Sequence, residues 1–198
     1  MNNRQIKSLQ TKKKISDIAL KLFNEKSFNQ VTVDEIISKT NTSKGSFYTH
    51  FKSKHDIFLE KFKEIDNYYV EELVDIIGKE KTYINKLTVF LRLQMAYIER
   101  DLGWDVVRTI YESELNTNRD SLFLLPNRPL YSILCKIFDE GQKNNEFRND
   151  FTPEYMVTIC VRVMRGILYD WSIHKADFSL IEEQTDIFEV MIRGLQKE

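Results

Sequence analysis

The chain has 198 residues, a formal net charge of −1, 42% hydrophobic residues and 30% charged residues, a composition typical of globular proteins. It contains no run of about 18 apolar residues and no apolar segment behind its N-terminus, so neither a membrane span nor a secretory signal is predicted. We expect a cytoplasmic protein in which Cys135 and Cys160 are buried free thiols.

The near-neutral total hides a charge asymmetry along the chain. Residues 1–63 contain 13 Lys and Arg against 6 Asp and Glu, whereas the remaining residues contain 16 against 24. A small basic segment joined to a larger acidic one indicates that the first segment meets a polyanion. Only six glycines and three prolines occur, and no alternating strand pattern is present, so the sequence predicts an all-α fold of about nine helices.

The N-terminal helices follow from apolar spacing and capping residues. Apolar residues from Ile15 to Phe23 predict a first amphipathic helix over about residues 8–26. Thr32 and Glu35 form a capping-box pattern for a short second helix, which ends before Asn41, a residue that tolerates a left-handed turn. A fourth helix is expected from Ser53 to about Ile77, again from a capping pattern between Ser53 and Asp56.

The third helix lies in the segment TSKGSFYTHFKSK, residues 42–54, with Thr42 or Ser43 as its cap. Residues placed about 100° apart put Ser43, Phe47, His50 and Phe51 on one side, where the two phenylalanines are the apolar anchor. The opposite arc holds Lys44, Gly45, Tyr48 and Thr49. Two short helices joined by a brief turn and packed on a longer helix describe a helix-turn-helix, whose exposed arc enters the major groove of DNA.

The chemistry of this arc suits nucleic acid. Gly45 permits close approach of the backbone, and Lys44 can reach a guanine edge or a phosphate. Tyr48 can donate to a phosphate, while Thr49 offers a hydroxyl and a methyl group. Lys54 would lie beside a helix N-terminus, which is itself a phosphate site. An ordinary solvated helix surface is the alternative for any one of these residues.

The segments ALKLFNEKSFNQVTVDEI and TSKGSFYTHFKSKHDIF, in this order and spacing, resemble the DNA-binding domain of the TetR/AcrR family of bacterial transcriptional regulators over residues 11–62. The resemblance implies a helix-turn-helix domain over residues 1–53, with a basic N-terminal arm, and an effector-binding and dimerisation domain over residues 54–198. The arm is either a disordered, phosphate-tracking segment or a solvated tail. The implied DNA contacts are Thr32, Val33, Lys44, Gly45, Ser46, Tyr48, Thr49, His50 and Lys54.

The last two helices predicted are long and apolar on most sides. The first follows the Thr152 cap, and the second opens with a capping box from Ser179 to Glu182. The resemblance implies that they pair with their copies in a homodimer, and Gly166 would permit close helix approach there. A core formed within one chain is the alternative.

The resemblance also implies a small-molecule pocket between the fifth and eighth helices. Each candidate aromatic residue could instead belong to the core. Arg162 and Arg165 require an anionic partner, which could be Asp170 or Glu112, or an acidic ligand. The candidate pocket residues are Phe90, Tyr97, Trp104, Arg108, Tyr111, Arg162, Met164, Arg165 and Tyr169.

These features predict a ligand-responsive regulator: a homodimeric repressor that a small molecule of unknown identity releases from a palindromic double-stranded DNA operator. The three histidines fit no catalytic or metal pattern, so no enzyme, metal or cofactor is expected, although metal or haem sensing through His174 and a cysteine is a lesser alternative. The composition and motifs also allow an activator without an effector, or a helical carrier whose helix-turn-helix is not functional.

Overall fold

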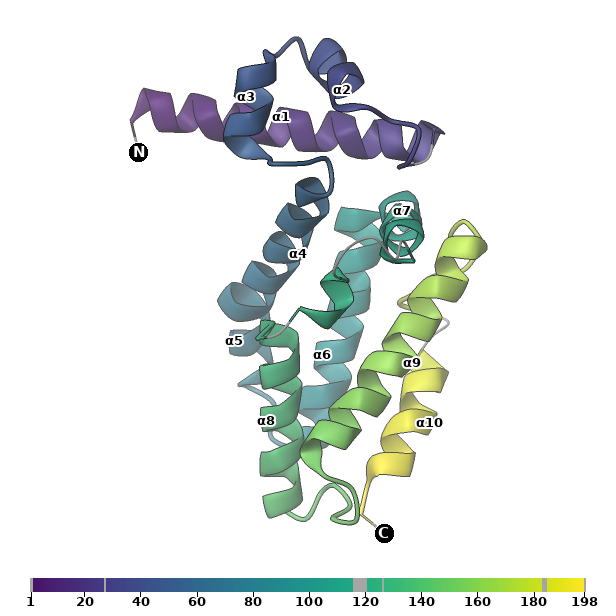
Figure 1. Ribbon diagram of the computed structural model, residues 1–198. Helices are drawn as coiled ribbons and strands as arrows, with labels where there is room; N and C mark the ends of the chain where they lie inside the picture. Colours follow the sequence, from purple (N-terminus) through teal and green to yellow (C-terminus); the bar gives the residue numbers. More distant parts are fainter. Residues whose placement is uncertain (1, 27, 116–120, 126, 183–184, 198) are drawn as a thin grey trace. The chain divides into compact units, whose positions relative to one another are not determined.

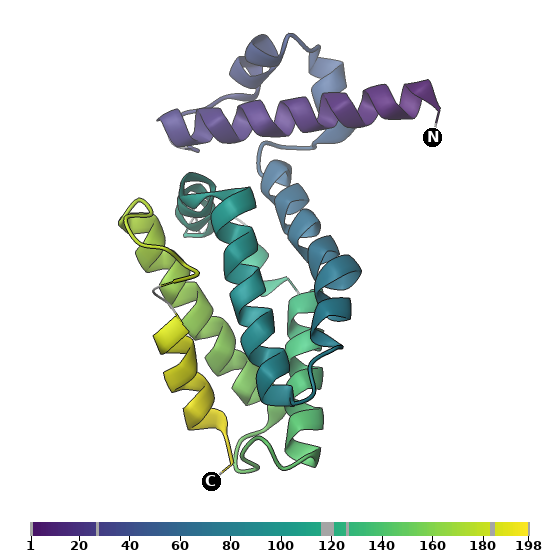
Figure 2. The ribbon, with the colours of Figure 1, turned by 180° about the vertical axis from the view of Figure 1, so that it is seen from behind.

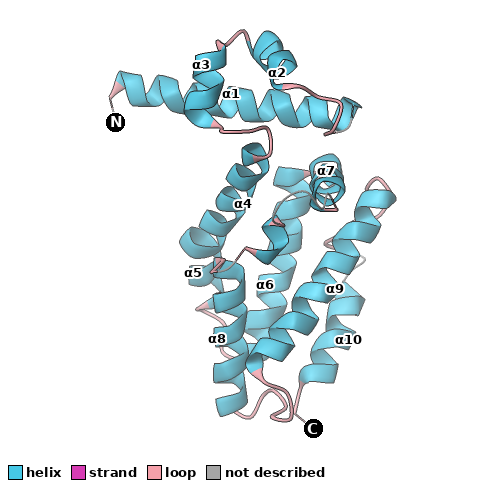
Figure 3. Ribbon diagram, in the orientation of Figure 1, coloured by secondary structure: helices cyan, strands magenta, loops and turns pink. Residues whose placement is uncertain are grey.

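The computed structural model describes residues 2–26, 28–115, 121–125, 127–182 and 185–197. These residues are helical apart from turns, loops and one isolated bridge between Phe147 and Gln196, and Figure 3 shows no strand among them. The all-α prediction is therefore confirmed. None of the described helices combines the length and apolar character that a bilayer crossing requires.

The chain divides into two compact units. The first contains Met1–Lys63 and Thr109–Phe123, and the second contains Glu64–Arg108 and Leu124–Glu198. The helices α4 (Asp56–Tyr68) and α7 (Trp104–Glu114) carry residues of both units.

In the first unit, α1 (Asn3–Lys26) is the long helix on which α2 (Val33–Thr40) and α3 (Lys44–His50) pack. Both short helices lie on the same side of α1 in Figures 1 and 2. The core of this unit is aromatic. The ring centroid of Phe23 lies 5.0 Å from that of Phe28 and 5.4 Å from that of Phe58. Edge and tilted contacts of this kind add to the free energy gained from burial alone.

The first helix begins at Asn3, earlier than the apolar pattern predicts. Asn2 and Gln5 cap it reciprocally, because the Asn2 N–H donates to Oε1 of Gln5 and the Gln5 N–H donates to Oδ1 of Asn2, both at 2.9 Å. The basic N-terminal arm is therefore helical and not disordered. Apolar periodicity missed these turns because residues 2–10 are exposed and carry no buried stripe.

The fourth helix also differs from its prediction. It begins at Asp56, because the Asp56 carboxylate accepts hydrogen bonds from the Lys52 N–H and the Ser53 hydroxyl before the helix starts. After Tyr68 the helix continues through a π-helical turn, Tyr69–Leu73, into α5 (Val74–Ile77). A second π-helical turn, Ile98–Leu102, follows α6 (Tyr83–Tyr97).

The second unit is a helical bundle around α6. Besides α6 it contains α8 (Pro129–Lys143), α9 (Pro153–Ile173) and α10 (Thr185–Leu195), and the short 3₁₀ turn Leu122–Leu124 precedes α8. In Figure 2 α6 lies between α8 and α10, and it packs against both. Its buried residues Leu87, Phe90 and Leu91 form the centre of the bundle.

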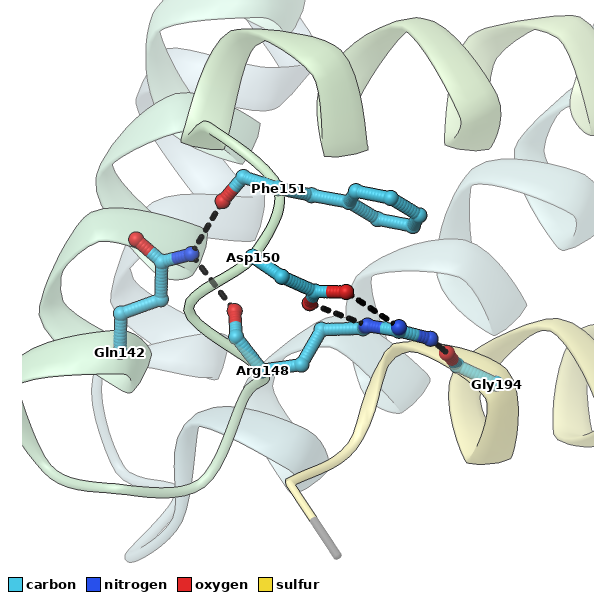
Figure 4. A network of polar contacts seen from close by, with 5 residues as sticks. All are labelled: Gln142, Arg148, Asp150, Phe151 and Gly194. Carbon is cyan, nitrogen blue, oxygen red and sulfur yellow. Dashed lines mark hydrogen bonds and ion pairs between the residues drawn. The ribbon is translucent and has the colours of Figure 1, made fainter.

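The end of α10 is fastened to the loop between α8 and α9. The Arg148 guanidinium pairs with both carboxylate oxygens of Asp150 and donates to the carbonyl of Gly194 at 3.1 Å, while Gln142 holds the carbonyls of Arg148 and Phe151 (Figure 4). This network makes the loop a fixed support for the last helix.

The start of the last helix was predicted wrongly. The Ser179 hydroxyl accepts from the N–H groups of Ile181 and Glu182, but α10 begins only at Thr185. Ser179 instead donates to the carboxylate of Glu99, which also accepts from the Leu180 N–H. The capping pattern at Ser179 thus occurs in a loop, which hydrogen bonds to Glu99 attach to the second π-helical turn.

The two cysteines differ in burial. Cys160 is fully buried, as predicted, and burial raises the pKa of its thiol to about 12. Cys135 is only half-buried, which the apolar pattern did not predict.

Candidate nucleic-acid interface

The α2–α3 pair is fixed by hydrogen bonds formed within a few residues. Oγ1 of Thr32 accepts from the Glu35 N–H at 3.2 Å at the start of α2, as the capping pattern predicts. Asn41 ends α2 in the left-handed region, with φ of 51° and ψ of 40°. Oγ of Ser43 then accepts from the Ser46 N–H at 3.1 Å and starts α3. Local side chains therefore set the direction in which α3 leaves the turn.

The third helix has the two faces that the sequence predicts. Phe47 is fully buried and Phe51 nearly so, with their ring centroids 5.8 Å apart. Of the predicted DNA contacts on this helix, those on the outer arc are exposed (Lys44, Gly45, Tyr48 and Thr49), whereas Ser46 and His50 are half-buried. At the start of α2, Thr32 is exposed and Val33 is half-buried.

Gly45 has no structural need to be glycine. A Cβ atom built there would meet only Oγ of Ser43, at 3.9 Å, which is an ordinary van der Waals distance. Glycine lowers helix stability relative to alanine, and nothing in the packing of α3 requires a glycine at this position.

The polar groups of the arc are loosely held. Nζ of Lys44 lies 3.3 Å from Oδ1 of Asp34, and both side chains are mostly exposed. Tyr48 is 48% exposed, and its ring packs edge to face with that of Phe47, with centroids 5.4 Å apart. The Thr49 hydroxyl donates to the Gly45 carbonyl at 2.8 Å, which leaves its methyl group and oxygen lone pairs for another partner.

Lys54 is engaged inside the first unit. Its ammonium donates to the carbonyls of Phe28 and Val31, at 2.5 and 2.8 Å, and lies 4.3 Å from the centroid of the Phe28 ring. This lysine ties the segment after α3 to the segment between α1 and α2. No local pattern predicts this contact, because the two segments are more than twenty residues apart.

The nine candidate pocket residues are dispersed. Phe90 and Met164 are buried in the second unit, Tyr97 and Trp104 are half-buried, and Arg108 is exposed. Tyr111 belongs to the first unit, where its ring lies 5.2 Å from that of Phe123.

The arginines of α9 lie in different environments. Arg165 is half-buried and donates to the hydroxyl of Tyr131 at 2.9 Å. Arg162 and Tyr169 are exposed, on the outer side of the helix. Asp170, a partner considered for these arginines, lies 3.5 Å from Nδ1 of His174, whose pKa is raised by the hydrogen bond to the Asp170 carbonyl.

Tyr97 has a partner that the sequence did not predict. Its ring stacks on that of Tyr68, with centroids 4.5 Å apart and an interplanar angle of 17°. Burial raises the pKa of both phenols, and the carboxylate of Asp101 adds to both shifts. Each tyrosine directly precedes one of the two π-helical turns, so the stack joins the two irregular points of these helices.

A buried amide lies one turn before this stack. Gln94 is 4% exposed, and no described residue donates a hydrogen bond to its Oε1. Buried polar atoms are nearly always satisfied, so this acceptor is an exception within the helical unit.

The outer faces of α9 and α10 expose apolar side chains. On α9, Tyr155, Tyr169 and Ile173 are each at least 50% exposed and share one face with Gly166. On α10, Ile187 is 46% and Val190 is 71% exposed. Among the described residues, no atom from outside the local helix lies within 4 Å of a Cβ atom built on Gly166 or Gly194, so the backbone is open to close approach at both positions.

Comparison with known proteins identifies the chain. Residues 15–60 match the family model described as bacterial regulatory proteins, tetR family. The regulator QacR of Staphylococcus aureus is 30% identical over 148 residues, which cover 69% of this chain and 73% of QacR. The chain belongs to the tetR family. Another member, the negative transcriptional regulator IcaR of the S. aureus biofilm operon, is 35% identical over 132 residues, covering 66% of this chain and 71% of IcaR.

The whole fold is that of solved tetR-family proteins. The crystal structure of FadR from Bacillus subtilis in complex with stearoyl-CoA superposes with a TM-score of 0.74 at 19% identity, covering 92% of this chain and 98% of FadR. The predicted architecture, an N-terminal helix-turn-helix followed by a C-terminal helical bundle, is thereby confirmed.

Sequence reasoning missed a buried ion pair in this tetR-family chain. Arg128, which precedes α8, donates to both carboxylate oxygens of Asp66 on α4, at 2.9 and 3.2 Å. The two residues are distant in sequence and sit in no motif, so only packing brings them together.

Proposed function

We propose that the chain is a homodimeric repressor that binds a palindromic operator through α3 and is released by a small-molecule effector. The observation that carries this proposal is the exposed arc of α3, which combines an unneeded glycine with hydroxyl and ammonium groups above a fully buried phenylalanine. Residues 1–53 would bind DNA, and residues 54–198 would bind the effector and form the dimer. We assign the protein to the cytoplasm and assign it no catalytic step.

The proposed DNA contacts divide by chemistry. Gly45, Thr49 and Ser46 would face base edges, since a missing side chain and short hydroxyls fit the major groove. Lys44, Tyr48 and His50 would contact phosphates or guanine edges, and Thr32 and Val33 would lie against the backbone at the start of α2. We assign Lys54 a positioning role, because its ammonium is already held by two carbonyl oxygens.

A second copy of the chain is the proposed partner of the exposed faces of α9 and α10. Tyr155, Ile173 and Val190 would be removed from water there, and the open backbone at Gly166 and Gly194 would allow the helices to approach closely. A two-fold dimer presents two copies of α3 to two half-sites, which explains a palindromic operator.

The effector would bind within the helical unit. Support comes from the buried, unsatisfied Oε1 of Gln94 and from the relative FadR, whose structure holds stearoyl-CoA. Phe90, Tyr97 and Met164 would provide apolar contacts to the effector. Arg165, held by Tyr131, is the proposed partner of an acidic group on the effector.

Release of DNA would follow from a shift in population. DNA favours one arrangement of the two recognition helices, and the effector favours another. An effective switch requires the effector to prefer its own arrangement by several kcal/mol, about 5.5 for an almost complete shift. The helix α4 would couple the two states, because its residues belong to both units.

DNA capture tests this function. Purified protein is incubated with fragmented genomic DNA of its source organism at near-physiological salt, and the retained fragments are sequenced. We expect enrichment of a few palindromic sites that disappears in a Tyr48→Ala variant. Uniform, salt-sensitive retention that Tyr48→Ala leaves unchanged would contradict the proposal and favour a carrier.

A further inference from the structure

A hollow of about 330 Å³ opens on the surface of the second unit, at the end of the bundle where α5, the start of α6 and the middle of α8 meet. This volume is near the lower end of the range of small-molecule sites, about 300–1,000 Å³. None of the nine pocket residues predicted from the sequence lines it. It is therefore separate from the effector site proposed above.

The floor of the hollow is apolar. Ile77 and Ile137 are buried beneath it, Ile133 is half-buried at its side, and Val74 forms a wall that is 39% exposed. Four branched aliphatic side chains from two helices thus face one opening. An apolar chain that covered them would gain free energy in proportion to the area removed from water.

The rim of the hollow carries net positive charge. Its ionic groups are the ammonium groups of Lys86 and Lys136 and the carboxylate of Glu140. The Lys86 ammonium lies 4.1 Å from the centroid of the Tyr83 ring, and no carboxylate of the described chain pairs with it.

The single carboxylate of the rim already has a cation and a hydrogen-bond donor as partners. Glu140 is 4.0 Å from Nζ of Lys136 and accepts the hydrogen bond of the Tyr83 hydroxyl, which raises the pKa of that phenol. Tyr83 therefore donates a hydrogen bond to the Glu140 carboxylate through its hydroxyl, and its ring makes a cation–π contact with the Lys86 ammonium. This arrangement leaves the Lys86 charge available to an anion above the apolar floor.

We propose that this hollow binds a small amphipathic carboxylate, with its aliphatic chain on Val74, Ile133 and Ile137 and its carboxylate between Lys86 and Lys136. The apolar floor favours an aliphatic chain on the ligand, and the excess ammonium group favours a carboxylate. This inference concerns ligand binding alone and does not depend on the DNA-binding function.

Decanoate is a suitable probe, used well below the concentration at which it forms micelles, with decanol as the uncharged ligand of equal chain length. Calorimetric titration of the whole protein should give saturable decanoate binding at least about tenfold tighter than decanol binding. The Lys86→Gln/Lys136→Gln double variant should lose this preference. Lys143→Gln, on the same helix but outside the hollow, should keep it.

Methyl NMR spectra locate the ligand. Decanoate should shift the methyl signals of Ile133 and Ile137 and leave those of the buried Ile98 and Ile167 in place. Ile133→Trp, which fills the hollow, should abolish both the shifts and the binding while circular dichroism remains unchanged. The proposal is overturned if decanoate does not bind, if the double variant binds it as tightly as the parent, or if only Ile98 and Ile167 respond.

Discussion

Arg128 holds Asp66 through two hydrogen bonds, of 2.9 and 3.2 Å, although 62 residues separate them. The arginine is 8% exposed and the aspartate side chain 18% exposed, so the pair is largely withdrawn from water. It ties the start of α8 to α4. The buried phenol of Tyr69 lies close enough to feel both charges, although burial is the main reason that its pKa is raised.

Asp66→Ala should destabilise the protein by about 3 kcal/mol, because it leaves the Arg128 guanidinium buried without its carboxylate. Urea unfolding at fixed protein concentration measures this change. The double variant Asp66→Leu/Arg128→Met should recover much of the stability, since two apolar side chains leave no unpaired charge. Equal instability of the single and double variants would show that the effect comes from packing and not from charge.

Gly45→Ala should separate stability from DNA affinity. The added methyl group meets no atom closer than 3.9 Å and removes the entropic cost of a helical glycine, so stability should rise by about 0.5 kcal/mol. Operator affinity should fall by about 1–3 kcal/mol, since the methyl group would occupy the space between α3 and the base edges. Thermal unfolding and fluorescence anisotropy give the two values. Unchanged affinity would remove Gly45 from the interface.

Lys44 and Lys54 should respond differently to salt. If Lys44 binds a phosphate, Lys44→Gln should reduce the slope of log affinity against log salt concentration by about 1. Lys54→Gln should leave the slope unchanged but lower the thermal stability, because it removes two charge-assisted hydrogen bonds to backbone carbonyls. A reduced slope for Lys54→Gln would reverse its assignment as a positioning residue.

Val190→Asp should convert the proposed dimer into monomers. Val190 is 71% exposed on the face assigned to the partner chain, where an unpaired carboxylate would be buried at a cost of about 3 kcal/mol or more, at least a hundredfold in the dissociation constant. Sedimentation velocity measures the change. Val70→Asp is the matched control, since Val70 is 55% exposed outside this face and should leave the dimer intact. A dimer that tolerates Val190→Asp would place the interface elsewhere.

The pair of Arg148 and Asp150 should contribute to stability in a pH-dependent way. The hydrogen bond from Arg148 holds the pKa of Asp150 below its usual 3.8. Because the folded pKa is the lower one, this contribution is present above pH 3.8 and disappears as the pH falls through the pKa of the folded state. The difference in unfolding midpoint between the parent and Arg148→Gln should therefore shrink below about pH 3.8. A difference that stays constant would assign the effect to the Gly194 hydrogen bond alone.

Local signals were enough to predict the helix-turn-helix. Thr32, Asn41 and Ser43 act within a few residues of their own positions, and the spacing of Phe47 and Phe51 fixes the buried side of α3. The engagement of Lys54 and the pairing of Arg128 with Asp66 depend on chain segments brought together by packing. Such contacts leave no periodic trace in a single sequence.

Of the two capping patterns predicted in the second unit, the Thr152 cap of α9 is confirmed, since its hydroxyl accepts from the Tyr155 N–H, but the pattern at Ser179 is not. Ser179 and Glu182 match the pattern for a helix start, but the nearby Glu99 carboxylate engages the Ser179 hydroxyl and the Leu180 N–H, and the chain forms a turn. The π-helical turns were also not predicted, because the apolar positions were matched to a regular α-helical period, which makes no allowance for one extra residue in a turn.

The π-helical turn Tyr69–Leu73 sets the rotation of the helix that follows it. A π turn accommodates one more residue than an α-helical turn, and each residue of an α-helix advances the side chains by about 100°. Val74 and Ile77 therefore face the hollow beside α8 because the π turn takes up that extra residue without the 100° advance it would add to an α-helix. If residues 69–73 formed a regular α-helical turn instead, this wall would rotate by about 100° away from its neighbours, although every apolar side chain of α5 would still be present.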